Sequence, residues 1–309
     1  MLLSTNSYFT LYGLYDKISV TVRTFWIYGG EIPMRNTLKC NGTFATVNGH
    51  KLHVYIRGNK NAPAIVFLSG HCTVAPVYDF KILYEKLLHN FKIIVIEKFG
   101  YGYSDIWDSP CDIDTLVSTQ RQALAMVQET GPYILVPHSM SGLEAIRWKQ
   151  TFPDEVSAIV GIDMATPLSF SVWTEEEIKK TVRLMRVLRR LNLANILSSL
   201  NNRSLTKDEI KQHELLKKRN AFNICCINEA REVLNNAKIV GEGGTIQCPT
   251  LLFSSNGSDQ ERDWVENQQK FAAIMGARLI SYDCGHYIHH FKSDEMCDEI
   301  NRFVNSLER

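Results

Sequence analysis

Short, mainly apolar runs alternate with longer stretches in which apolar residues recur three and four positions apart. The apolar runs lie at residues 64–68, 91–96, 133–136 and 156–162. The stretches with helical spacing lie at about 77–89, 114–129 and 140–150. Runs of the first kind are typical of buried strands, and spacing of the second kind is typical of amphipathic helices. The alternation predicts a mostly parallel central sheet with helices on both faces, which is an α/β fold.

The flanking regions complete the expected organisation. Asn48-Gly49 separates two short strand patterns and supplies both positive-φ positions of a type I′ hairpin turn. Residues 166–244 have no convincing strand and helical patterns at 175–191, 206–226 and 229–237. After them the alternation returns, with strands at 249–254 and 278–282 and helices at 264–275 and 294–307. We therefore predict an N-terminal extension (1–42), an α/β core (43–165 and 245–309) and an inserted helical cap (166–244).

Composition narrows the class of protein only modestly. Of 309 residues, 45% are hydrophobic and 22% charged, which is ordinary for a globular protein. The net charge of +1 gives no reason to expect nucleic acid as a partner. The eight cysteines show no C-x-x-C spacing and several lie in apolar runs, which favours reduced thiols and a cytoplasmic location. No run of 18 apolar residues predicts a transmembrane helix.

Two segments raise the question of a membrane surface. The first 35 residues are rich in aromatic side chains, and we expect them to pack on the globule or on a partner. Within 175–191, apolar residues share one face and Lys179, Arg183, Arg186 and Arg190 share another. This pattern favours a solvated face of a helical lid; the alternative is a surface for anionic lipid or an acidic substrate. The sequence does not determine the oligomeric state.

A serine stands where a buried strand passes into a helix, in Pro137-His138-Ser139-Met140-Ser141-Gly142. A sharp turn at such a place raises the serine Oγ above the sheet edge and needs small neighbours. The backbone N–H after the serine then points at the position of a developing oxyanion. The alternative is an ordinary strand–helix loop with a surface serine.

This segment resembles the nucleophile elbow of the α/β-hydrolase superfamily, usually G-x-S-x-G, with Pro137 and Ser141 in place of the two glycines. The order of elements from about residue 43 to 309 is also similar to that fold, with a cap inserted after the sixth strand. The resemblance implies a serine hydrolase in which Ser139 is the nucleophile. The epoxide hydrolase and haloalkane dehalogenase branches use an aspartate nucleophile, so Ser139 argues against both.

A serine hydroxyl needs a base to activate it. His286 follows the last predicted strand and a glycine, where this superfamily carries its catalytic histidine. Two other interpretations are a surface histidine and a metal pair formed by His286 and His290. No Glu stands between them in a zincin pattern, so we expect no metal site.

Two aspartates could orient that histidine and stabilise its imidazolium form. Asp163 ends the sixth predicted strand, where some members of the superfamily carry their acid. Asp259 lies about one residue beyond the usual position after the seventh strand. We expect Asp163 first and Asp259 second. Asp283 precedes His286 too closely, and we expect it to turn away.

The backbone of two loops completes the expected site. Met140 would donate one N–H to the oxyanion, and Ser69-Gly70-His71-Cys72 resembles the family loop that provides the other, which carries that role to His71. Gly100-Tyr101-Gly102 could suggest a dinucleotide loop, but Asp105 stands at the position of the third glycine. We expect no cofactor.

The resemblance therefore implies hydrolysis of an acyl bond in a small-molecule substrate, a carboxylic ester first. An aminopeptidase-like amide hydrolase on the same triad is the closest alternative. A non-catalytic ligand-binding protein on the same fold is a third interpretation.

Overall fold

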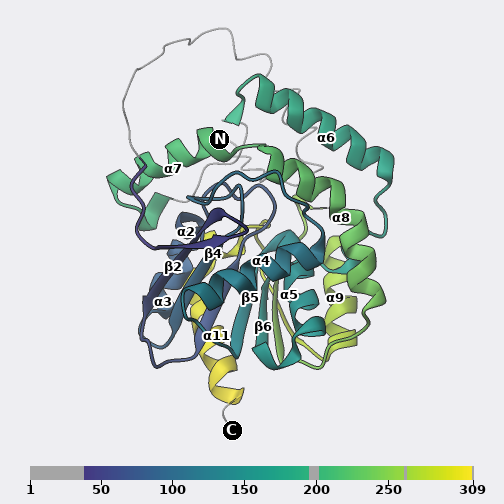
Figure 1. Ribbon diagram of the computed structural model, residues 1–309. Coiled ribbons are helices and arrows are strands. Elements are labelled where there is room, and N and C mark those ends of the chain that lie inside the picture. The colour runs from purple at the N-terminus through teal and green to yellow at the C-terminus, as the bar shows by residue number, and fades with distance from the viewer. Residues whose placement is uncertain (1–37, 195–201, 261–262, 308–309) are drawn as a thin grey trace, which may run out of the picture.

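The structure is a computed structural model that describes residues 38–194, 202–260 and 263–307 (Figure 1). Nearly all of the expected N-terminal extension, including its aromatic residues, lies outside the described residues. Within the described part, no helix combines the length and the apolar character needed to cross a bilayer.

One eight-stranded sheet runs through the molecule in the order β1-β2-β4-β3-β5-β6-β7-β8. The strands are β1 (Thr43–Val47), β2 (His50–Gly58), β3 (Ala64–Leu68), β4 (Lys92–Glu97), β5 (Tyr133–Pro137), β6 (Val156–Ile162), β7 (Thr250–Ser254) and β8 (Arg278–Ser281). Only the β1–β2 and β2–β4 pairings are antiparallel. Asn48 and Gly49 both have positive φ between β1 and β2, as the Asn-Gly pair predicts. The mostly parallel sheet confirms the predicted fold class.

Helices cover both faces of this sheet. Those outside the predicted cap are α2 (Pro76–Asp79), α3 (Lys81–Leu87), α4 (Ile113–Met126), α5 (Gly142–Thr151), α9 (Trp264–Met275), α10 (Ile288–Phe291) and α11 (Ser293–Leu307). Successive side chains of a strand point to opposite faces, so Ile65 and Phe67 enter one hydrophobic core with residues of α3 and α11. Val66 and Leu68 enter the other core, with residues of α4 and α5. The alternating strands thus join two buried layers.

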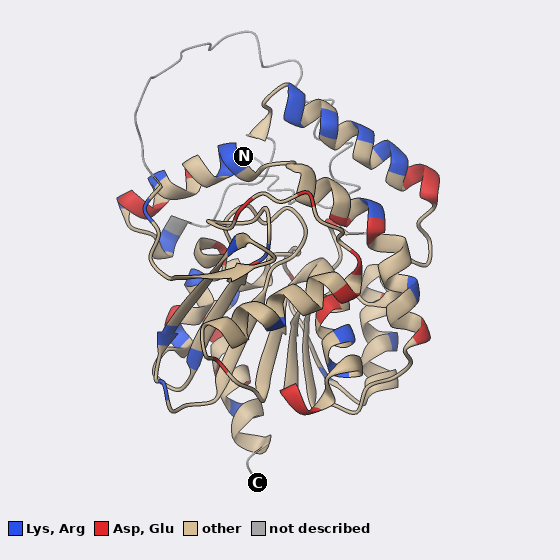
Figure 2. Ribbon diagram, viewed as in Figure 1, with Lys and Arg blue, Asp and Glu red and all other residues tan. Residues whose placement is uncertain are grey.

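Residues 166–244, which we call the insert, connect β6 to β7. They form η3 (Pro167–Phe170), α6 (Glu175–Arg190), η5 (Asn202–Ser204), α7 (Lys207–Asn220) and α8 (Ile224–Glu242). Figure 1 shows α6 and α7 at one end of the sheet, while α11 extends past the other. Figure 2 shows basic residues along α6, beginning after its acidic first turn. The division of the chain into a cap (166–244) and a core stays a prediction.

Some predicted helix boundaries are wrong for reasons visible in the structure. The predicted helix at 77–89 is two helices divided at the buried Phe80. A helix predicted to reach Cys226 ends at Asn220, because the Asn223 side chain accepts the backbone N–H groups of Cys225 and Cys226 and begins α8 there. The short helix α10, directly after His286, was not predicted at all.

Candidate active site

Ser139 occupies the turn between β5 and α5 with a φ of 56°. A non-glycine residue in this region is uncommon and marks a strained turn. The Ser139 carbonyl accepts the backbone N–H of Ala165 at 2.7 Å, which ties the turn to the loop after β6. A Cβ on Gly142 would lie 2.1 Å from the Ala165 carbonyl oxygen, so this close approach requires glycine. The serine is half-buried, and its hydroxyl makes no hydrogen bond to the described residues.

Ser141 stands where the superfamily pattern has a glycine, and its hydroxyl has a structural task there. The Ser141 Oγ donates to the Leu68 carbonyl at 2.8 Å and accepts the His138 N–H at 3.0 Å. Leu68 ends β3, so Ser141 joins the turn to the neighbouring strand. Although Ser141 replaces the second glycine of G-x-S-x-G, its hydroxyl therefore bonds the turn to His138 and to the end of β3.

His286 lies in the loop after β8 with its ring almost fully buried. Its Nδ1 is 2.6 Å from Oδ2 of Asp163, which follows β6. The other oxygen of Asp163 accepts the Ser255 N–H and the Trp264 indole N–H, both at 2.9 Å. With Nδ1–H donated to Asp163, Nε2 of His286 carries a lone pair. That nitrogen makes no hydrogen bond to the described part of the chain.

Asp259 contacts a different part of the same histidine. Its two carboxylate oxygens lie 3.1 and 3.3 Å from the backbone nitrogen of His286. Asp259 therefore holds the loop, whereas Asp163 holds the ring. Asp283 turns away and accepts a hydrogen bond from Asn256 at 2.8 Å.

The ring of His138 packs against that of His286, with 4.6 Å between the ring centroids. Burial, followed by the neighbouring His286 and His289, lowers the pKa of His138 well below its usual range. Burial at this position therefore favours the uncharged ring. His138 precedes Ser139, so it brings the serine turn and the His286 loop together.

The loop after β3 lies against Ser139. A Cβ on Gly70 would be 2.7 Å from the Ser139 Cβ, so glycine permits this approach. The next backbone N–H, that of His71, has no hydrogen-bond acceptor among the described residues, and neither has that of Met140. In contrast, the Cys72 N–H donates to the Tyr101 hydroxyl at 3.1 Å. The ring Nε2 of His71 lies 2.9 Å from the carbonyl of Cys226 in α8.

The sequence and the fold of the chain are similar to those of several known proteins. No family model matches the chain. The uncharacterized protein YbdG of Bacillus subtilis is 32% identical over 249 residues, covering 77% of this chain and 76% of YbdG. Lipase LipV of Mycobacterium tuberculosis is 33% identical over 123 residues, covering 39% of this chain and 44% of LipV. The structure of epoxide hydrolase VrEH1 from Vigna radiata matches with a TM-score of 0.68 at 14% identity, covering 86% of this chain and 98% of that one. The chain has the α/β-hydrolase fold.

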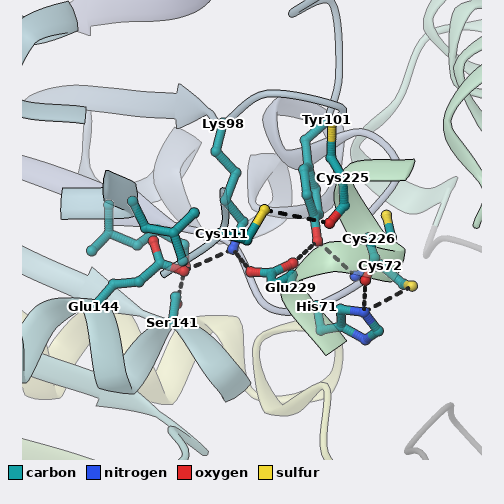
Figure 3. A network of polar contacts seen from close by, with 12 residues as sticks. His71, Cys72, Lys98, Tyr101, Cys111, Ser141, Glu144, Cys225, Cys226 and Glu229 are labelled. Carbon is teal, nitrogen blue, oxygen red and sulfur yellow. Dashed lines mark hydrogen bonds and ion pairs between the residues drawn. The ribbon is translucent and has the colours of Figure 1, made fainter. Parts of the chain in front are cut away.

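The protein has a buried ionic network beside the Gly70–Cys72 loop, formed by Lys98, Glu144, Glu229 and Tyr101 (Figure 3). Lys98 follows β4 and donates to Glu144 of α5 at 2.7 Å and to Glu229 of α8. Tyr101 also donates its hydroxyl to Glu229. Glu229 thereby connects the insert, through Tyr101, to the backbone of Cys72.

The charges of this network depend on one another. Burial would lower the pKa of Lys98, but Glu144 and Glu229 raise it above its ordinary value. Burial opposes ionisation of both glutamates. At Glu144 it prevails, and the pKa is raised; at Glu229 the contact with Lys98 prevails, and the pKa is lowered. Nothing in the local sequence pairs Lys98 with Glu229, which is 131 residues away.

A second buried cluster joins α10 to α2. His289 and His290 place their Nε2 atoms 3.0 and 3.1 Å from the two different oxygens of Asp79. Burial opposes ionisation of Asp79, yet His290 and His289 lower its pKa well below the usual range. Burial lowers the pKa of His289 to about 4. The three side chains could hold a metal ion, since their donor atoms lie within 4.8 Å of one another. Hydrogen bonds from His289 and His290 to Asp79 already account for the two short distances, however. His286 and His290 thus have different carboxylate partners.

Proposed function

We propose that this α/β-hydrolase is a serine hydrolase that cleaves a small-molecule carboxylic ester through an acyl-enzyme intermediate. One observation carries the proposal: a buried imidazole, bound to Asp163 through Nδ1 at 2.6 Å, belongs to the same sheet edge as a serine held at positive φ. Strained turns and buried His–Asp pairs are typical of sites that activate a nucleophile.

In the proposed reaction, Nε2 of His286 takes the hydroxyl proton of Ser139 while Oγ attacks the acyl carbonyl. The Met140 and His71 N–H groups, which have no other acceptor among the described residues, donate to the resulting oxyanion. Collapse of the tetrahedral intermediate breaks the ester C–O bond, and His286 returns the proton to the leaving alkoxide. A water molecule, deprotonated by His286, then releases the acid and restores Ser139.

Asp163 takes the role of the orienting acid in this proposal because it contacts the ring. Asp259 accepts the backbone N–H of His286, so it supports the loop. Replacing Asp163 would allow the ring to adopt the wrong tautomer, which in other triads costs about 10⁴ in kcat.

The lipase name of LipV supports an ester as the substrate class. An amide hydrolase of the aminopeptidase type would use the same groups on a more stable bond. A carboxylate near the serine, placed to bind a substrate amine, would favour it. The buried carboxylates Glu144 and Glu229 are instead occupied by Lys98.

The test is a panel of acyl esters and aminoacyl amides assayed with wild type, Ser139→Ala, Asp163→Asn and Asp259→Asn. We expect loss of roughly 10³-fold or more for Ser139→Ala and Asp163→Asn, and less than about tenfold for Asp259→Asn. Asp283→Asn is the matched control, because Asp283 bonds only to Asn256 among the contacts described above. A fluorophosphonate probe should label wild type but not Ser139→Ala. Unchanged turnover in Ser139→Ala would reject the mechanism, and absence of both labelling and turnover in wild type would favour a binding protein.

A further inference from the structure

The outer side of helix α6 combines cationic and aliphatic side chains. The exposed cations, which we call the basic face, are Lys179, Lys180, Arg183, Arg186 and Arg190. At 100° per residue, Val187 lies among them on the side opposite the buried residues Ile178 and Met185. Val187 is 51% exposed and the following Leu191 is 60% exposed. A purely solvated face would not require two such large aliphatic groups.

Three of these five cations have no ion-pair partner within the part of the chain that the structure describes. Lys179 pairs with Glu175 at 3.1 Å, but Arg183, Arg186 and Arg190 form no ion pair with any described residue. By contrast, Arg189 on the same helix donates to carbonyls at the end of α7 and is used structurally. The insert contains 14 Lys and Arg against 9 Asp and Glu, whereas the rest of the chain contains 20 against 24. Positive charge is therefore concentrated in the insert.

A groove of about 440 Å³ runs between α6 and α8 beside the basic face. Its apolar lining comes from Ile178, Val182 and Leu234. Arg183 and Arg186 line it from α6, and Arg231 lines it from α8. An apolar groove with cationic side chains along it suits a molecule that has a hydrocarbon part and an anionic group.

We propose that the basic face docks on a bilayer that contains anionic phospholipid. The arginines would contact headgroup phosphates, Val187 and Leu191 would enter the interface, and the groove would receive part of one lipid. Amphipathic helices that lie in the interface have this mixture of cations and exposed aliphatic residues. A folded acidic protein would satisfy the charges, but it would give no reason for aliphatic side chains between them.

Vesicle co-sedimentation tests the proposal without relying on catalysis. The full chain is mixed with vesicles of phosphatidylcholine alone or of phosphatidylcholine with phosphatidylglycerol. Each cation near an anionic surface strengthens binding roughly fivefold, so Arg183→Gln/Arg186→Gln/Arg190→Gln should weaken it about a hundredfold. The matched control Lys60→Gln/Lys270→Gln/Arg302→Gln removes the same charge from exposed positions outside the insert and should bind like wild type.

The outcomes are distinct. Binding that requires phosphatidylglycerol, weakens with added salt and is lost only in the α6 variant supports the proposal. Val187→Ser/Leu191→Ser should weaken binding without changing its dependence on salt. Equal loss in both triple variants would show a net-charge effect and overturn the assignment to α6. A wild-type protein that stays in the supernatant with anionic vesicles would also overturn it and leave an acidic protein as the occupant. Ser139→Ala should bind as wild type, so failure of the proposed enzyme function is a separate result.

Discussion

The molecule carries charged side chains in two opposite settings, a buried network that includes Glu229 of the insert and the basic face of α6. In the buried network, Lys98 donates to Glu144 and Glu229, and Tyr101 donates to Glu229; all four side chains are buried. On the basic face, Arg183, Arg186 and Arg190 are exposed and have no ion pair among the described residues. The two sets of charges therefore have different effects on the protein. Buried charges are costly and must be matched, so they determine geometry, whereas exposed charges are inexpensive and act on whatever approaches.

The largest expected effect comes from breaking the buried network. Glu229→Leu would leave Lys98 with Glu144 alone, and losing one partner of a buried pair costs about 3–5 kcal/mol. Urea unfolding measures this loss. Glu232→Leu on the same helix is the control and should change the free energy of unfolding by less than about 0.5 kcal/mol. Similar losses for the two variants would contradict the importance of the buried pairing.

A smaller effect, on catalysis rather than on stability, is expected from a change that moves the loop carrying His71. Tyr101→Phe removes the hydroxyl that accepts the Cys72 N–H, and we expect the loop carrying His71 to shift. If His71 donates to the oxyanion, kcat should fall roughly tenfold or more with little change in KM. Tyr103→Phe removes a hydroxyl from the same turn that contacts Tyr78 instead, at 2.6 Å, and should leave kcat near the wild-type value. Equal effects of the two would show that the loop does not depend on Tyr101.

The network should also respond to acid. The pKa of Glu229 is lowered in the folded protein, so its contribution to stability is fully present above the ordinary value of 4.5 and is lost as pH falls through the folded value. The difference in unfolding free energy between wild type and Glu229→Gln should therefore be constant near neutral pH and shrink below pH 4.5. Denaturant titrations at several pH values measure it. A difference that grows on acidification would have the wrong sign.

The smallest effect is expected on the basic face. Arg186→Gln removes an exposed charge without an ion pair, so the free energy of unfolding should change by less than about 0.5 kcal/mol. The same variant should reduce binding to anionic vesicles about fivefold. A marked loss of stability would show that Arg186 supports the fold, which would remove the contrast with Lys98.

The sequence predicted the strands of the core because their runs are almost continuously apolar and are bounded by turn residues. Boundaries in the insert were harder, since Asn223 begins α8 through a side-chain cap within a stretch that reads as one helix. In the candidate site, the segments around Ser139 and His286 have recognisable neighbours. No such pattern decides between Asp163 and Asp259, because the choice depends on which carboxylate reaches the ring of His286 and which reaches its backbone.

The network and the Asp79 cluster were not predicted for a related reason. Lys98 and Glu229 look like ordinary charged residues, and only the packing of α8 on the core makes them partners. Asp79 and His289 are 210 residues apart. Local patterns report the faces of helices and strands, but contacts of this separation are decided by tertiary packing.

The segment between α7 and α8 is attached by hydrogen bonds to the loops that follow β3 and β4. Asn220 donates to the carbonyls of Val74 and Gly102, and Asn223 donates to that of Gly100. His71 contacts the carbonyl of Cys226 a few residues further on. Helix α8 is therefore hydrogen-bonded to the loops near the serine and forms part of the wall around it. Moving α8 away from the serine would break these hydrogen bonds, so we expect a molecule to enter by movement of other segments.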